Sequence, residues 1–342
     1  MTRDIPRRRE LTLDEFCAGV RECNITILPR ALTLIESNNP VHQQQAELLL
    51  TRLLPHTGQA IRVGITGASG VGKSTFIEAV GLQLVRDGRR VAVLAVDPSS
   101  GVSGGSILGD KTRMTKLSSD PHAFIRPSPA AGTLGGVARK TRESMLICEA
   151  AGYDVVLVET VGVGQSETMV ADMTDCFLAL MLPGAGDDLQ GIKRGLLELV
   201  DVIAINKADG DTLFAAQVAA RQYESALQSL LGRHQSLPTV LTCSALHKEH
   251  VDTVWEAVAE RYATLKASGE LGERRRRQGV RWLWAIIEDR LRQAVHDHPG
   301  VRAIRDGLEK DVLAGTTSPE VAARKILDAF GLVETPRSGS TP

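Results

Sequence analysis

Two patterns of hydrophobic and polar positions alternate along the central part of the chain. Short, almost continuously apolar runs predict strands at residues 61–66, 91–96, 154–159, 176–182, 201–206 and 239–243. Between them lie longer segments in which apolar residues recur every three or four positions, as in amphipathic helices. Strands that are apolar on both faces are typical of a parallel sheet covered by helices. The pattern therefore predicts an α/β fold with a mostly parallel central sheet flanked by helices, over residues 60–265.

Helical patterns precede and follow this core. Within residues 1–59, Thr12 and Glu15 have the spacing of a capping box, and residues 31–36 and 45–54 have helical apolar periodicity. Residues 266–333 are again helical in pattern, with a last helix near 319–330. Residues 334–342 are polar and rich in Pro, Ser and Thr, which predicts disorder. The sequence thus predicts helical extensions at both ends of the core and a short tail.

Composition excludes several classes of partner. The chain has 342 residues, 43% of them apolar, and a formal net charge of -1, so nothing in its overall charge favours nucleic acid. The first ten residues lack the apolar core of a signal peptide, and no run approaches the roughly twenty apolar residues that span a bilayer. None of the five cysteines forms a C-x-x-C pair, and Cys148, Cys176 and Cys243 lie within apolar runs, which favours buried thiols in a reducing compartment. We expect a cytoplasmic protein without membrane or nucleic-acid partners.

The basic run at residues 274–277 does not change the expectation that the protein lacks a nucleic-acid partner. Four consecutive arginines are flanked by Glu270, Glu273 and Glu288. Such mixed charge is typical of a solvated helix or an inter-subunit surface rather than of a nucleic-acid patch.

The strongest chemical motif is G-A-S-G-V-G-K-S, which follows the first predicted strand and opens an amphipathic run. This is the strand-to-helix context of a phosphate-binding loop (P-loop). Its glycines leave no side chain between backbone N–H groups and a phosphate, and the helix N-terminus favours an anion. Lys73 is placed to reach the β- and γ-phosphates, and Ser74 to ligate Mg²⁺. The predicted phosphate contacts are Gly67, Ala68, Ser69, Gly70, Val71, Gly72, Lys73, Ser74 and Thr75, with Lys73 also a catalytic candidate.

A second motif indicates which base is bound. Asn206, Lys207 and Asp209 form N-K-A-D at the end of a predicted strand. Guanine presents N1–H and an exocyclic amine on one edge, and one carboxylate can accept from both, whereas adenine offers no such donor pair. Asp209 is therefore predicted to select GTP, with Asn206 bracing the loop and Lys207 lying over the base. The segment Ser244, Ala245 and Leu246 follows the last predicted strand, where backbone amides can contact guanine O6.

Acidic residues near the ends of two other strands are metal candidates. Glu159 ends one predicted strand, and Gly162 follows it in the position of a switch glycine that bonds the γ-phosphate. Glu159 is placed to contact Mg²⁺ through water. Because aspartate is the usual residue at this position, direct ligation of the metal by Glu159 stays open. Asp97 and Asp110 lie in a predicted first switch, as Mg²⁺ candidates or as ordinary turn residues. The predicted metal set is Ser74, Asp97, Asp110 and Glu159.

The catalytic group is less clearly marked. Ras-like proteins carry glutamine directly after the switch glycine, but Val163 occupies that position here and cannot orient water. Gln165 is the nearest candidate for orienting the water. Asp97 and Lys73 are further candidate catalytic residues. The sequence predicts slow hydrolysis that a partner or a dimer accelerates.

Together these motifs resemble one family closely. The stretches are G-A-S-G-V-G-K-S, V-D-P-S-S, G-G-S-I-L-G-D-K-T-R-M, I-R-P-S-P, V-E-T-V-G-V-G-Q-S-E, G-D-D-L-Q-G-I-K and N-K-A-D, and the similarity runs from about residue 30 to 284. They are similar to the MeaB/ArgK family, SIMIBI-class P-loop GTPases that act as chaperones of adenosylcobalamin-dependent methylmalonyl-CoA mutase. The resemblance implies a homodimeric GTPase that gates adenosylcobalamin loading and protects the mutase from inactivation. It also implies a mobile loop at 183–193, in which Lys193 transmits partner binding to hydrolysis.

Cobalamin itself is expected on the partner. Cobalamin-binding mutase domains carry Asp-x-His-x-x-Gly, and the nearest approach here is Asp120-Pro-His122, followed by Ile125 in place of the glycine. Other functions stay open: a chaperone of another mutase such as isobutyryl-CoA mutase, a protein kinase or phosphotransferase linked to amino-acid transport, a nickel-delivery GTPase, or a binding module without turnover.

Overall fold

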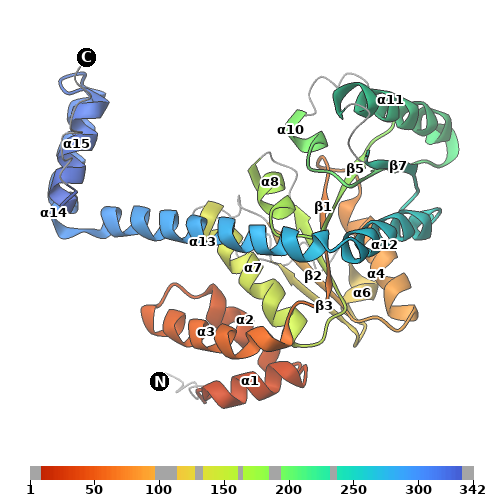
Figure 1. Cartoon of the computed structure of the whole chain (residues 1–342), viewed down its shortest axis with the longest axis horizontal. Coiled ribbons are helices and arrows are strands. Elements are labelled where there is room, and N and C mark those ends of the chain that lie inside the picture. The colour runs from red at the N-terminus through yellow and green to blue at the C-terminus, as the bar shows by residue number, and fades with distance from the viewer. Residues whose placement is uncertain are drawn as a thin grey trace, which may run out of the picture. The chain divides into compact units, whose positions relative to one another are not determined.

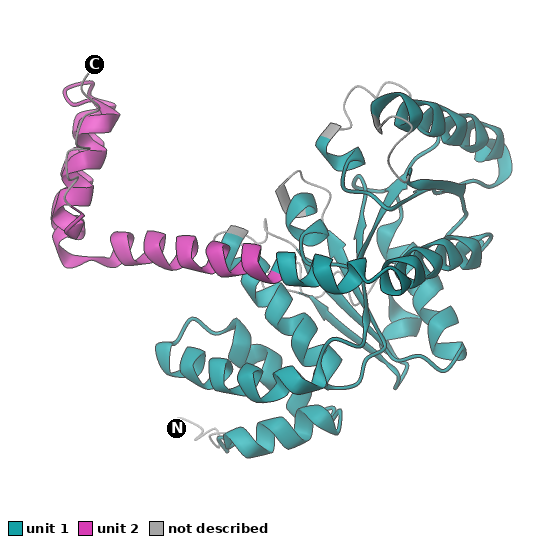
Figure 2. Cartoon of the chain, in the orientation of Figure 1, with its two compact units in different colours: residues 1–278 teal, residues 279–342 magenta. Residues whose placement is uncertain are grey.

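The computed structural model describes residues 9–96, 114–127, 134–160, 165–184, 194–231 and 237–332 (Figure 1). For residues 134, 165, 166, 194 and 231 it describes the backbone alone. The chain separates into two compact units, residues 1–278 and 279–342 (Figure 2).

Within the described residues of the first unit, seven strands form one parallel sheet in the order β3-β2-β4-β1-β5-β6-β7. The strands are β1 (Ile61–Thr66), β2 (Val91–Val96), β3 (Ala123–Pro127), β4 (Val155–Thr160), β5 (Cys176–Met181), β6 (Val202–Ile205) and β7 (Thr239–Thr242). β1, β2, β4, β5 and β6 are buried almost throughout, as a sheet covered on both faces requires.

Helices cover both faces of this sheet (Figure 1). Successive strand residues alternate between two cores: Ala92 and Leu94 face one, and Val91 and Val93 face the other. The first core is completed by α1 (Leu13–Arg21), α2 (Ile27–Glu36), α3 (Pro40–Leu53), α7 (Leu134–Ala150), α8 (Gln165–Ala171), α10 (Arg194–Leu197) and α11 (Leu213–Leu231). The second is completed by α4 (Lys73–Arg86), α6 (Thr115–Ser118) and α12 (Val251–Ala267). Two 3₁₀ turns, η1 (Leu54–His56) and η2 (Gly210–Thr212), complete the described elements of this unit apart from the start of α13.

The predicted fold class is confirmed, and one strand was missed. All six predicted strands are present, with ends shifted by at most one residue. β3 was not predicted because it is short, lies at the sheet edge and ends in proline, so its apolar pattern is weak. The capping box at the start of α1 is confirmed: the Thr12 hydroxyl accepts from Glu15 N, and the Glu15 carboxylate accepts from Thr12 N.

A buried ionic cluster lies at the amino-terminal edge of the sheet. Asp175, which directly precedes β5, has no exposed surface and accepts two hydrogen bonds from Arg275, at 2.8 and 2.7 Å. Arg275 belongs to α13 (Glu270–Asp297) and also donates to the carbonyls of Gly58 and Ala60, at 2.5 and 2.8 Å. Asp175 additionally accepts from the Arg62 backbone N–H at 2.9 Å. These ion pairs fasten the start of α13 to strands β1 and β5.

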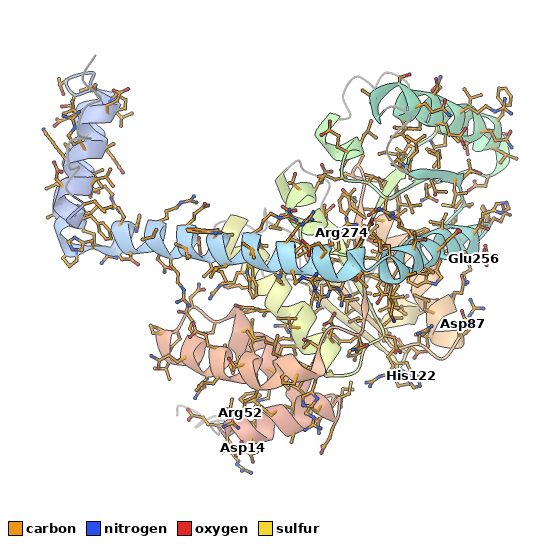
Figure 3. All side chains as sticks on the ribbon, viewed as in Figure 1. Asp14, Arg52, Asp87, His122, Glu256 and Arg274 are labelled. Carbon is orange, nitrogen blue, oxygen red and sulfur yellow. The ribbon has the colours of Figure 1, made fainter. Side chains whose placement is uncertain are left out.

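The basic run of α13 is therefore only partly solvated. Arg274 pairs with Asp201, whose side chain is 7% exposed, as Arg275 pairs with Asp175. Arg274 is labelled on the ribbon of α13 in Figure 3. Arg276 and Arg277 instead pair with Glu273 at the surface. The sequence predicted a solvated helix or an inter-subunit surface for this run. Its first two members instead pair with carboxylates at the strand starts, because such buried carboxylates need cationic partners.

Three of the five cysteines lie in the core, as predicted. Cys148, Cys176 and Cys243 are buried, and burial raises the pKa of the Cys176 and Cys243 thiols to about 12. All five sulfurs are free of disulfides. Among the helices of the described ranges, none combines the length and apolar character needed to cross a membrane.

The second unit comprises the later part of α13, α14 (Pro299–Leu313) and α15 (Pro319–Phe330). The last helix coincides with its predicted range. α14 and α15 pack against each other with a small core that includes Val301, Leu308 and Ala322. Several large apolar side chains of this unit are exposed, among them Trp284 and Leu313.

The ionic cluster gives a stability prediction. Replacing Asp175→Ala leaves the buried Arg275 guanidinium and the Arg62 N–H without their acceptor, so we expect the free energy of unfolding to fall by about 3–5 kcal/mol. Glu273→Ala, which removes an exposed partner of two arginines on the same helix, is the matched control and should leave stability unchanged. Denaturant unfolding followed by circular dichroism measures both. Equal losses in the two variants would contradict the structural role of the cluster.

Candidate functional site

The P-loop lies between the carboxyl end of β1 and the start of α4. Gly67 and Gly72 have φ values of 146° and 101°, a region that favours glycine. A side chain at Gly67 would meet the Leu180 carbonyl oxygen at 2.4 Å, and one at Gly72 would meet the Asn206 amide nitrogen at 2.6 Å. The loop is thus confined between neighbouring strand ends and holds its backbone N–H groups at the N-terminus of a 14-residue helix. That arrangement suits a phosphate group.

The polar side chains of the P-loop contact groups beside it. The buried ammonium of Lys73 donates to the carbonyls of Gly67 and Ala68 at 2.6 and 3.1 Å. The Ser74 hydroxyl donates to the Glu159 carboxylate at 3.0 Å. Sheet pairing explains the second contact, because Glu159 lies beside Ile65 on the neighbouring strand. A hydroxyl and a carboxylate oxygen side by side are ligands of the kind that Mg²⁺ prefers.

Asn206 joins the P-loop to the base-contacting segments. Its side-chain nitrogen donates to the Val71 carbonyl at 2.8 Å, and its side-chain oxygen accepts from Ala245 N at 2.9 Å. The Cys243 thiol also donates to this oxygen at 3.7 Å. With 2% exposure, Asn206 is a fully buried strut between three loops.

Asp209 and Ser244 meet beside that strut. The Ser244 hydroxyl donates to one Asp209 carboxylate oxygen at 2.5 Å, and His247 Nε2 lies 3.9 Å from the other. The Ala208 N–H donates to the Cys243 carbonyl at 3.0 Å, which ties the two segments together. The structure thus brings the N-K-A-D and S-A-L segments to one point next to the P-loop. Ala245 is buried, while Leu246 is 73% exposed at the edge of the site.

Three further polar residues connect this edge of the sheet. The Thr66 hydroxyl, at the end of β1, lies 2.9 Å from the Thr160 hydroxyl at the end of β4. It also lies 3.0 Å from a carboxylate oxygen of Glu167 in α8. The sequence interpretation assigned these residues no role. The available signal was a hydroxyl residue at the end of each of two buried strands, directly before the P-loop and directly after Glu159.

Several predicted site residues lie outside the described residues: Asp97, Asp110, Gly162 and Lys193. Gln165 is placed only as the first residue of α8, without its side chain. The metal roles of the two aspartates and the catalytic roles of Asp97, Gln165 and Lys193 stay predictions. Val96 pairs with Thr160, so the strand that precedes Asp97 ends at the same edge as Glu159.

The Asp120-Pro-His122 stretch lies at the end of the sheet where the parallel strands begin. His122 is exposed in the turn before β3, and its backbone N–H donates to the Asp120 carboxylate at 2.9 Å (Figure 3). Its carbonyl accepts from Val91 N at the start of β2. Because the strands are parallel, this turn lies at the edge opposite the P-loop.

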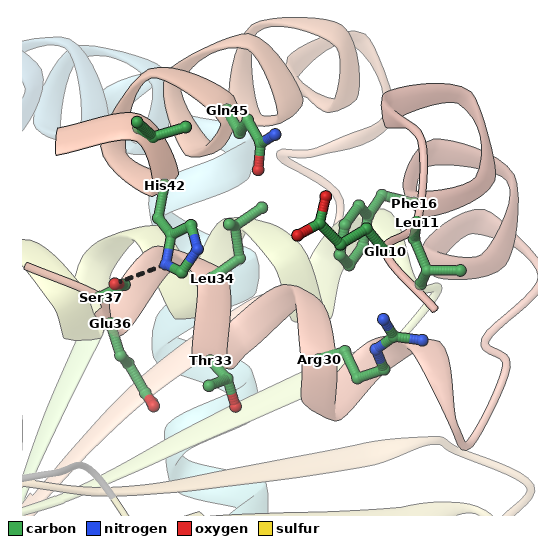
Figure 4. A pocket seen from close by; sticks show the side chains of 11 residues that line it. Glu10, Leu11, Phe16, Arg30, Thr33, Leu34, Glu36, Ser37, His42 and Gln45 are labelled. Atoms are coloured by element: carbon green, nitrogen blue, oxygen red, sulfur yellow. Dashed lines mark hydrogen bonds between the residues drawn. The ribbon is translucent and has the colours of Figure 1, made fainter. Parts of the chain in front are cut away.

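A cavity of about 630 Å³ lies within the N-terminal helices (Figure 4). Several of its polar lining groups have partners: Ser37 Oγ lies 2.8 Å from His42 Nδ1, Arg30 donates to the Arg9 carbonyl, and Glu36 pairs with Arg126. None of its lining residues belongs to the P-loop or the guanine-contact segments. The cavity is therefore separate from the residues that the sequence predicts to bind phosphate and base.

Comparison with known proteins agrees with this geometry. The sequence model of the family described as "Methylmalonyl Co-A mutase-associated GTPase MeaB" matches residues 28–300. The chain belongs to the MeaB family. GTPase ArgK of Escherichia coli is 53% identical over 283 residues, which cover 82% of this chain and 86% of that protein. The mouse protein described as "Methylmalonic aciduria type A homolog, mitochondrial" is 43% identical over 340 residues, covering 96% of this chain and 82% of that one.

A solved structure is also similar over nearly the whole length. It is described as a LAO/AO transport system kinase and has a TM-score of 0.74 at 41% identity, covering 94% of this chain and 99% of that one. The MeaB-family protein studied here is thus a GTPase with the expected α/β fold. The resemblance inferred from the motifs is confirmed.

Asp209 gives a test of base selection in this MeaB-family protein. Asp209→Asn replaces a double acceptor with one acceptor and one donor, which suits xanthine because xanthine has a carbonyl where guanine has the amine. We expect GTP affinity to fall about 100-fold and XTP affinity to exceed it. Calorimetric titration with GTP, XTP and ATP measures the change. The exposed Asp211→Asn is the control, and unchanged GTP affinity in Asp209→Asn would disprove the assignment.

Proposed function

We propose that the P-loop, Asn206 to Asp209 and Ser244 to Leu246 form the GTP site of this GTPase, with Mg²⁺ held next to Ser74. The supporting observation is that Asn206 hydrogen-bonds both the P-loop and the Ser244–Leu246 segment. These contacts support a site in which the proposed phosphate-binding and base-binding elements are held together.

The proposed metal site fits Mg²⁺ chemically. Ser74 and Glu159 supply neighbouring oxygen ligands, 3.0 Å apart. Among the described residues, no three His, Cys, Asp or Glu side chains gather into a metal cage. Mg²⁺ sites in nucleotide-binding proteins need none, because one or two side chains, phosphates and waters supply the ligands. Bound there, the ion would neutralise charge on the β- and γ-phosphates, with Asp97 and Asp110 proposed to complete its shell.

We further propose that GTP hydrolysis gates adenosylcobalamin loading of methylmalonyl-CoA mutase and protects that enzyme from inactivation. The family description, which names this mutase, supports the choice of client. Adenosylcobalamin would be carried by the partner. In this proposal Lys193 transmits partner binding to the site and Gln165 orients the attacking water. The free thiols favour a reducing compartment such as the cytoplasm.

A homodimer is proposed on the basis of the helical arm. Val280, Trp284 and Leu291 are each more than half exposed, and their spacing of four and seven residues places them on one face of α13. An exposed apolar stripe of this kind on a long helix is typical of a helix–helix interface. A second copy of the chain is the occupant that we infer.

A phosphotransferase is the second candidate function, because a similar solved structure is described as a transport system kinase. The two reactions differ in where the γ-phosphate goes. In hydrolysis it appears as inorganic phosphate, and in a kinase reaction it appears on an acceptor. Incubation with GTP labelled at the γ-phosphate and candidate acceptors therefore distinguishes them, because only a kinase leaves label on the acceptor.

The client proposal predicts a nucleotide-dependent complex. Purified protein should bind adenosylcobalamin-dependent methylmalonyl-CoA mutase, and the mutase should raise its rate of phosphate release from GTP at least about tenfold. Lys73→Ala, which lacks the phosphate-binding ammonium, should lose both GTP binding and this stimulation. Isobutyryl-CoA mutase serves as the alternative client. Failure to capture a cobalamin-dependent mutase with either GDP or a non-hydrolysable GTP analogue would refute the chaperone function.

The dimer proposal predicts a change in mass. Sedimentation equilibrium should give twice the chain mass for the wild-type protein, and the double variant Trp284→Asp, Leu291→Asp should give a monomer. Charges on the apolar face would have to be buried in the interface, at a cost of several kcal/mol. Gln293→Asp, an exposed position on the opposite face of the same helix, is the control. A wild-type monomer at micromolar concentration would rule the interface out.

A further inference from the structure

Thr160, Thr66 and Glu167 form a chain of hydrogen bonds whose direction is fixed. A carboxylate can only accept, so the Thr66 hydroxyl donates its one proton to Glu167, at 3.0 Å. Thr66 must then accept from the Thr160 hydroxyl, at 2.9 Å. Thr66 is fully buried and Thr160 is 1% exposed. The hydrogen bonds in such a chain polarise one another, and this chain ends on a carboxylate, whose charge strengthens each bond.

Each member of this relay adjoins a different functional segment. Thr66 directly precedes Gly67 of the P-loop. Thr160 directly follows Glu159, which contacts Ser74. Glu167 is in the first turn of α8, two residues after Gln165. The relay therefore ties the P-loop, the metal-side strand and the start of α8 together beneath the proposed nucleotide.

The two ends of α8 are held differently. Its last turn is fastened by Val170 and Ala171, which are buried in the first core. Its first turn is held through the Glu167 carboxylate to Thr66. The last turn of α8 is fixed by apolar packing, whereas the first turn is held by a single polar contact. The hydrogen-bond chain therefore controls the position of the first turn.

We propose that Glu167 is a positioning residue for GTP hydrolysis. Through Thr66 it fixes the first turn of α8, and thereby residue 165, relative to the phosphates. The inference rests on the proposed nucleotide site. Glu167 touches neither GTP nor the attacking water in this scheme. Loss of the relay should therefore lower kcat while nucleotide affinity is retained, because displacement of a water-orienting group by about 1 Å is enough to slow the chemical step severely.

The test uses single-turnover hydrolysis of GTP with excess full-length protein, together with GDP titration. Thr66→Val, which keeps shape and loses the hydroxyl, and Glu167→Ala should each lower the rate about tenfold. GDP affinity should stay within about threefold of wild type. The double variant should be no slower than the slower single variant, because both changes break one link. Thr66→Ser should restore the wild-type rate, and the exposed Thr168→Ala should not change it.

Three outcomes would overturn the proposal. They are a wild-type rate in Glu167→Ala, multiplied losses in the double variant, and rate losses that follow loss of folded protein in thermal unfolding. Lys73→Ala separates this proposal from the one on which it rests. If that variant keeps GDP affinity, the nucleotide site itself is misassigned, whatever the relay variants show.

Discussion

Parallel hydrogen bonding between buried strands is the constraint on which the other features depend. It places the carboxyl ends of β1, β4, β5, β6 and β7 at one edge of the sheet. The P-loop follows β1, Glu159 is the penultimate residue of β4, and Asn206 follows β6. Residues separated by more than 130 positions, such as Val71 and Asn206, are therefore in contact without further scaffolding. The site is a consequence of strand direction and order.

Within that edge, buried polar groups satisfy one another across strands. Asn206 uses both its amide nitrogen and its amide oxygen, and Thr66 both donates and accepts. Buried polar groups without partners would be costly, so each of these contacts also fixes the relative position of the loops that carry it. Hydrogen bonds thus link the Asn206–Asp209 and Ser244–Leu246 segments to the P-loop, and link the end of β1, which leads into the P-loop, to the start of α8.

The opposite edge of the sheet has a different task. There Asp175 and Asp201 lie at the starts of β5 and β6 and are neutralised by arginines from α12 and α13. Arg275 also satisfies two backbone carbonyls before β1. The proposed nucleotide site and the attachment of the start of α13 therefore lie at opposite ends of the parallel strands. The first residues of α13 belong to the compact GTPase unit for this reason.

The sequence alone determined much of the fold. Continuous apolar runs predicted the parallel sheet, because only strands covered on both faces lack polar alternation. The P-loop and N-K-A-D motifs predicted the GTP site, because phosphate and guanine chemistry require particular residues at fixed local spacing. β3 was missed because Arg126 and Pro127 interrupt its apolar run, whereas the edge strand β7, although shorter, keeps the β-branched and apolar run T-V-L-T.

Only the tertiary structure decided which distant polar residues meet. The arginine run of α13 has the composition of a solvated surface, yet Arg275 is held in a buried ion pair with a residue one hundred positions away. Thr66, Thr160 and Glu167 are unremarkable by spacing and meet only because β1 and β4 are neighbours and α8 returns to them. Local motifs record the chemistry of single segments. Contacts between segments depend on strand order and helix packing, which no single stretch of sequence specifies.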